Sequence, residues 1–90
     1  MRIARVDGTV TASVKDKKLA GLKLLVVDIQ DGAGNLLESS VVAVDNIGAG
    51  VGELVLVVRG SAARIPAGIS NIPADATVVA IIDEITLTQK

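Results

Sequence analysis

Residues 45–64 read DNIGAGVGELVLVVRGSAAR, and this stretch joins a glycine-rich connection to a run of branched apolar residues. The run at 54–58 is apolar at every position and rich in valine, a composition that favours an extended strand over a helix. The alternating glycines before it indicate a tight connection with positive φ angles or close backbone packing. After it, Ser61 suits the N-cap of a short helical turn. The stretch therefore predicts a strand over residues 53–58 that is entered through a tight loop.

The spacing of these glycines argues against a phosphate-binding loop. A dinucleotide fingerprint has the spacing G-x-G-x-x-G and opens a helix, whereas here Gly48, Gly50 and Gly52 alternate and a strand follows. A strand has no helix dipole to hold a pyrophosphate, and the segment lacks the lysine of a P-loop. Asp45 and Glu53 flank the loop and would repel phosphate. We therefore expect the loop to have a structural role.

The rest of the chain predicts four further strands. Residues 4–14 alternate between apolar even positions and polar odd positions, which is typical of a strand with one buried face. Residues 22–30 and 36–44 flank DGAGN, whose Asp-Gly and Gly-Asn steps suit a hairpin turn. The last strand is expected over residues 76–87. The 90 residues allow a single domain (1–90), and this pattern predicts an all-β, small five-stranded OB-like β-barrel with one short helical turn.

Two of the expected strands lack the alternation of apolar and polar residues. In residues 54–58 and 76–82 both faces favour burial. A barrel of this size has only one interior, and monomers rarely expose apolar patches beyond a few hundred Å². The pattern therefore predicts an obligate oligomer in which further subunits cover the outer faces.

The composition argues against catalysis. The chain has no His and no Cys, so the commonest general base and the strongest thiol nucleophile are missing, and Ser61 has no His partner. Asp83 and Glu84 are adjacent on the expected last strand, where their side chains would point to opposite faces. Asp28 and Asp31 could contribute to a carboxylate metal site, but hard cations want more oxygen ligands, which favours two solvated turn acids. We expect a non-enzymatic protein with no cofactor and no metal.

Nucleic acids and membranes are disfavoured as partners. The chain has no Phe, Tyr or Trp and a net charge of -1, so a single-strand-binding platform would lack its stacking side chains and its positive groove. No apolar run approaches the roughly 20 residues of a membrane helix, and the first ten residues lack the apolar core of a signal peptide. The absence of Cys fits a reducing cytoplasm. An OB-like module that binds nucleic acid or a small ligand is the alternative to an assembly role.

Four segments match a known pattern in register, namely ARVDGTV (4–10), LAGLKLLVV (19–27), AVDNIGAGVGELVLVVRGSAAR (43–64) and ATVVAIIDEI (76–85). Together they resemble the vertex proteins of bacterial microcompartment shells, the EutN/CcmL type. The resemblance implies a cyclic pentamer of OB-like barrels at the corners of a polyhedral shell in the cytoplasm, either a carboxysome or a catabolic metabolosome. The implied partners are identical subunits in a homopentamer and the hexameric shell proteins of the same compartment, with no nucleic acid and no membrane.

The resemblance also implies which residues serve assembly. The glycine loop is similar to the segment near the pentamer axis, where small residues would let five backbones converge. Residues 60–64 match the family's Gly-Ser-Ser-Ala-Arg turn, with Ala62 in place of a second Ser. The implied residues of the axis or pore loop are Asp45, Gly48, Ala49, Gly50, Gly52 and Glu53. The implied residues of the subunit or shell interface are Gly60, Ser61, Ala63, Arg64 and Asp83.

Overall fold

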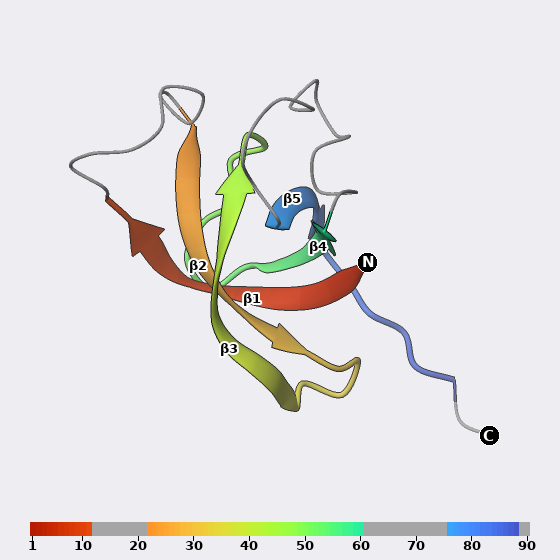
Figure 1. Ribbon diagram of the computed structural model, residues 1–90. Helices are drawn as coiled ribbons and strands as arrows, with labels where there is room; N and C mark the ends of the chain where they lie inside the picture. Colours follow the sequence, from red (N-terminus) through yellow and green to blue (C-terminus); the bar gives the residue numbers. More distant parts are fainter. Residues whose placement is uncertain (12–21, 61–75, 89–90) are drawn as a thin grey trace.

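The computed structural model describes residues 1–11, 22–60 and 76–88, which form a closed barrel of five strands (Figure 1). The order around the barrel is β1-β2-β3-β5-β4, and β4 pairs again with β1. This confirms the predicted all-β five-stranded barrel. The strands are β1 (Arg2–Val10), β2 (Lys23–Gln30), β3 (Leu36–Asp45), β4 (Leu54–Arg59) and β5 (Ala76–Ile82).

Small branched side chains fill the interior of the barrel. Ala4 of β1 lies opposite Ile29 of β2 on one side and opposite Val55 of β4 on the other, and all three are buried. Side chains alternate between the two faces of a strand, so the neighbours of these residues point outward. The buried apolar cluster consists of Ala4, Val6, Leu25, Val27, Ile29, Val41, Ala43, Ala49, Val55, Val57, Ala76 and Val78.

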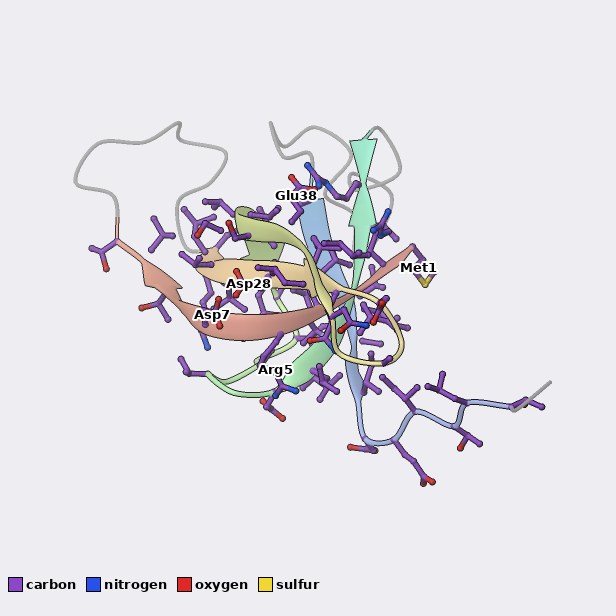
Figure 2. All side chains as sticks on the ribbon, turned by 90° about the horizontal axis from the view of Figure 1, so that it is seen from below. Met1, Arg5, Asp7, Asp28 and Glu38 are labelled. Atoms are coloured by element: carbon purple, nitrogen blue, oxygen red, sulfur yellow. The ribbon has the colours of Figure 1, made fainter. Side chains whose placement is uncertain are left out.

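The barrel closes through a short contact between β3 and β5. One parallel pair, Val44 with Thr77, joins these strands, and both residues are buried. In addition, Glu38 of β3 forms an ion pair with Arg59 of β4, with 2.7 Å between Oε1 and Nη1 (Glu38 is labelled in Figure 2). Partly exposed ion pairs contribute about 1 kcal/mol or less, so burial dominates the closure.

Two aspartates fix the hairpin between β2 and β3. Asp31 Oδ1 accepts the backbone N–H of Asn35 at 2.9 Å, and Oδ2 accepts the Asn35 side-chain amide at 3.0 Å. These bonds hold the pKa of Asp31 below its usual value. Asp28 Oδ1 accepts the N–H of Ser40 at 2.9 Å, where the β2–β3 register shifts and Ser40 has a φ of 59°. Asp28 therefore supports a bulge conformation that a non-glycine residue seldom adopts.

A bulge at Asp7 interrupts the predicted alternation of β1. The register with β2 shifts between Val6 and Gly8, so Asp7 is an extra residue and Gly8 lies opposite Val26. Val6 is buried, but Gly8 falls on the outer side with Val26. The prediction of one uninterrupted row of inward even positions is therefore wrong beyond Val6. The strand ends at Val10, and the predicted continuation over 12–14 lies outside the described residues.

The last strand is shorter than predicted. It ends at Ile82, which lies opposite Leu54. Because Leu54 is the first residue of β4, no further residue of that strand can pair with the chain after Ile82. Residues 83–88 then leave the barrel as an extended segment (Figure 1). Asp83 and Glu84 are exposed in this segment, so their predicted position on the strand is wrong. Within the described ranges, no helix is long and apolar enough to cross a membrane.

Candidate functional site: the loop between β3 and β4

The glycine loop is built around the buried carboxylate of Asp45. This residue ends β3 and is only 2% exposed. Its Oδ1 accepts the backbone N–H groups of Ile47 at 2.9 Å and Gly48 at 3.2 Å, and its Oδ2 accepts that of Ala49 at 2.8 Å. Ala49 is itself fully buried and belongs to the core cluster. Asp45 therefore holds the loop in shape from inside.

The three alternating glycines have different roles. Gly48 has a φ of 105° and Gly52 a φ of 91°, which is backbone that L side chains rarely adopt. Gly50 has no positive φ, and an added Cβ there would lie 3.3 Å from Glu53 Oε1, the end of a flexible side chain. Glu53 Oε1 also accepts the Gly50 N–H at 2.6 Å. The predicted positive φ angles are thus confirmed at Gly48 and Gly52.

Bonds from distant strands fasten the loop to the barrel. The Gly52 N–H donates to the Val6 carbonyl at 2.8 Å, and the Val6 N–H donates to the Glu53 carbonyl at 3.0 Å. Arg5 Nη1 donates to the Gly52 carbonyl at 2.9 Å, and Lys23 Nζ donates to the Ala49 carbonyl at 2.8 Å. Sequence reasoning missed Arg5 and Lys23, because pairing between strands brings them to the loop. In the structure Lys23 lies opposite Asp45 on the neighbouring strand, and this pairing is not visible in the sequence.

The loop amides are committed to acceptors of the same chain. The N–H groups of residues 47–50, 52 and 53 all donate to oxygens of residues 6, 45, 50 and 53. A phosphate cradle needs such amides free to point at the anion. The loop presents two apolar side chains to solvent, since Ile47 is 47% and Val51 65% exposed, beside the exposed polar residues Asn46 and Glu53. Its chemistry therefore suits contact with another protein surface.

Two carboxyl groups meet on the outside of β1 and β2. Asp7 and Asp28 are hydrogen-bonded through their side chains, and Figure 2 shows both on the same side of the barrel as Arg5. The bond to Asp28 raises the pKa of Asp7, whereas the bond to Asp7, together with the Ser40 N–H, lowers the pKa of Asp28. Asp28 thus pairs with Asp7, whereas Asp31 bonds to Asn35 within the hairpin. The described residues contain no cluster of three or more potential metal ligands.

We expect Asp7→Asn to change how the free energy of unfolding depends on pH. The raised pKa of Asp7 contributes stability below its unfolded pKa, and this is lost as the pH rises through the folded pKa. The lowered pKa of Asp28 works oppositely and contributes stability above its unfolded pKa. In the variant, the new side-chain amide at position 7 can donate to the Asp28 carboxylate wherever Asp28 is ionised, and its own charge does not change with pH. Urea denaturation from about pH 4 to pH 7 should therefore show a small relative gain for the variant as pH rises. Parallel pH profiles for both proteins would contradict the hydrogen bond between Asp7 and Asp28.

The remaining implied interface residues are only partly described. Gly60 directly follows β4 with a φ of 68°, and Asp83 is exposed just after β5. Ser61, Ala63 and Arg64, and with them the predicted helical turn, lie outside the described residues. The structure therefore brings Asp45, Gly48, Ala49, Gly50, Gly52 and Glu53 together in one loop and places Asp83 on the segment after β5.

The molecule is a closed barrel whose glycine loop is hydrogen-bonded to the same chain. Apolar side chains are exposed on this loop and lie on the outer side of the strands. These features define a structural module that acts through its surfaces. The family model described as "Ethanolamine utilisation protein EutN/carboxysome" matches residues 1–83. The chain belongs to this EutN/CcmL family.

Similar proteins cover nearly the whole chain. The "Carboxysome shell vertex protein CcmL" of Nostoc sp. is 54% identical over 86 residues, which are 94% of this chain and 85% of the relative. The "Bacterial microcompartment shell vertex protein EutN" of Escherichia coli (strain K12) is 44% identical over 85 residues, 94% of this chain and 90% of the relative. The solved "GrpN pentameric microcompartment shell protein from Rhodospirillum rubrum" superposes with a TM-score of 0.87 at 38% identity and covers 99% of this chain and 100% of that one.

Proposed function

We propose that this chain is the pentameric vertex subunit of a bacterial microcompartment shell, a carboxysome or a metabolosome in the cytoplasm. The observation that carries the proposal is the match to shell vertex proteins over nearly the whole chain, including a pentameric one of the same fold. The protein is structural and not an enzyme. Its work is geometric, because a flat layer of hexagonal tiles closes into a polyhedron only where pentagonal units replace hexagons.

The partners of the pentamer are proposed to be hexameric shell proteins of the same compartment. The loop of residues 45–53 is proposed to lie at the five-fold axis. Its support is the compact, self-bonded backbone, which carries glycine at positions 48, 50 and 52 and so lets identical copies approach closely. No specific feature favours the nucleic-acid-binding alternative, since the chain has no aromatic side chain on which a base could stack.

Native mass spectrometry of the purified chain tests the assembly. We expect a particle of about 45.5 kDa, five times the 9.1 kDa of one chain, at micromolar concentration. A monomer or dimer as the main species would overturn the proposal.

Co-expression with the hexameric shell proteins tests the vertex role. Closed polyhedral particles should form with this chain, and open sheets or tubes without it, as seen by electron microscopy. Closed particles that form equally well without the chain would count against a vertex role. The matched control is the same co-expression with a variant that folds but does not form pentamers.

A further inference from the structure

Two consecutive residues of β1 hold the end of the glycine loop at Gly52. Arg5 Nη1 donates to the Gly52 carbonyl at 2.9 Å, and the Val6 carbonyl accepts the Gly52 N–H at 2.8 Å. Val6 is buried in the core, whereas the Arg5 side chain is exposed. The bond from Arg5 is therefore the part of this attachment that can be released without opening the barrel.

The Asp7–Asp28 carboxyl pair lies beside Arg5. Arg5 is opposite Asp28 in the β1–β2 register, and the bulge at Asp7 adds the second carboxyl group next to them (Figure 2). An ionised carboxylate is only an acceptor, so two carboxyl groups hydrogen-bond to each other only when one of them carries a proton. Asp28 also accepts the Ser40 N–H at 2.9 Å, which suits the ionised partner. Asp7 is then the residue that carries the proton.

We propose that Arg5 and the carboxyl pair form a pH-sensitive clasp on the glycine loop. While Asp7 carries its proton, the pair has a single negative charge and Arg5 holds the Gly52 carbonyl. When Asp7 ionises and its proton leaves to solvent, two adjacent negative charges attract the guanidinium. A carboxylate is a stronger acceptor for arginine than a neutral carbonyl, so Arg5 turns to the pair and releases Gly52.

The direction of the pH dependence follows from the contacts of the pair. The hydrogen bond to Asp28 raises the pKa of Asp7, and the positive charge of Arg5 lowers it by less. The bonds from Asp7 and Ser40 lower the pKa of Asp28, so Asp28 stays ionised as the acceptor while Asp7 is protonated. The clasp is therefore closed below the folded pKa of Asp7 and opens as the pH rises through it.

Other described residues near the pair do not replace Arg5 as the responding cation. β3 contributes the uncharged N–H of Ser40, and its Glu38 is engaged in the ion pair with β4. Opposite Arg5, β4 contributes the apolar Leu54. The loop itself contributes Glu53, a titratable group that follows Gly52 directly and accepts the N–H of residue 50. Any test of the clasp must therefore separate the titration of Asp7 from that of Glu53.

A pH titration followed by carbon NMR spectroscopy tests the clasp in the wild-type protein. The side-chain carboxyl signal of Asp7 reports its ionisation, and the carbonyl signal of Gly52 reports the bond from Arg5. Between about pH 3 and pH 8, both signals should change with one midpoint. The Ala49 carbonyl is the internal control, because it accepts from Lys23 at 2.8 Å, and its signal should not follow Asp7.

Four variants identify the groups responsible, and far-UV circular dichroism confirms that each is folded. Asp7→Asn should keep the clasp closed, so the Gly52 signal should stay constant above the titration of Asp28. Arg5→Met should abolish the Gly52 response while Asp7 still titrates. Glu53→Gln should retain the response. Arg2→Met is the matched control, since it also removes an exposed arginine of β1, and it should behave as wild type.

Hydrogen exchange of the Gly52 amide gives a second measurement. The ratio of its exchange rate in wild type to that in Asp7→Asn cancels the intrinsic pH dependence of exchange. This ratio should rise about threefold or more across the titration of Asp7, because the Gly52 peptide loses one hydrogen bond. A constant ratio would overturn the release of the loop.

The clasp is a property of the single chain, and only its position at a five-fold axis rests on the proposed function. A Gly52 carbonyl signal that ignores Asp7, or that follows it equally in Arg5→Met, would overturn the clasp and leave the vertex function standing. A monomeric wild type with coincident Asp7 and Gly52 titrations would support the clasp and overturn the proposed function.

Discussion

Asp45→Ala is expected to lower the free energy of unfolding by about 3 kcal/mol, because three backbone amides lose a charged acceptor. The carboxylate is buried, so water can replace it only if the loop opens. Urea denaturation followed by far-UV circular dichroism measures the loss, since the chain has no aromatic residue for fluorescence. Variant and wild type must be compared at one protein concentration, because assembly adds to apparent stability.

Two comparisons sharpen the Asp45 experiment. Glu84→Ala removes an exposed carboxylate beyond the barrel and should change stability little. In Asp45→Ala the amides of Ile47, Gly48 and Ala49 should also exchange with solvent faster than in wild type, whereas the amides of the buried β2 strand should not. A loss below about 1 kcal/mol would show that the loop does not depend on this carboxylate.

Gly52→Val is expected to cost about 2 kcal/mol or more in folding stability, because a β-branched residue at a φ of 91° is strained. An added Cβ meets nothing within 4 Å, so the effect comes from the backbone and not from a clash. Gly52→Asn should cost less, since Asn tolerates positive φ better. Gly50→Ala should cost less than about 1 kcal/mol, because its neighbour is a movable side-chain tip. Equal losses for Gly50→Ala and Gly52→Val would contradict the separate roles of these glycines.

The same glycines distinguish folding from assembly. If the loop lies at the five-fold axis, Gly50→Val should give a folded chain that forms fewer pentamers. Native mass spectrometry and circular dichroism measure the two effects separately. Normal pentamers from Gly50→Val would show that position 50 does not need to be small at the axis.

Sequence patterns located every described strand but not every strand end. Apolar runs and the DGAGN turn place each strand correctly, because local composition decides extended structure. The bulge at Asp7 could not be predicted from the sequence. Gly8 and Val10 continue the row of apolar residues at even positions, although the bulge turns them to the other side of the sheet. The early end of β5 depends on where β4 begins, which is a property of the pairing and not of the last strand itself.

The candidate site was predictable in outline only. Glycine spacing and the following strand identify a tight structural loop, and the positive φ angles at Gly48 and Gly52 follow from that. The hydrogen bonds by which Asp45, Arg5 and Lys23 anchor the loop could not be predicted in this way. Each of these side chains acts across a pairing of strands or folds back on its own loop, so no local spacing reveals it.

The way the barrel closes also bears on how fast subunits become available. Closure requires β1 to meet β4, and Ala4 and Val55 are about 50 positions apart in the chain. Such distant pairings make for folding in milliseconds to seconds, and β4 and β5 are also the last strands to leave the ribosome. Until they arrive, a nascent chain has no closed barrel with which to join a ring. Ring formation after dilution from denaturant should therefore begin with a lag that does not depend on concentration, followed by a phase that does.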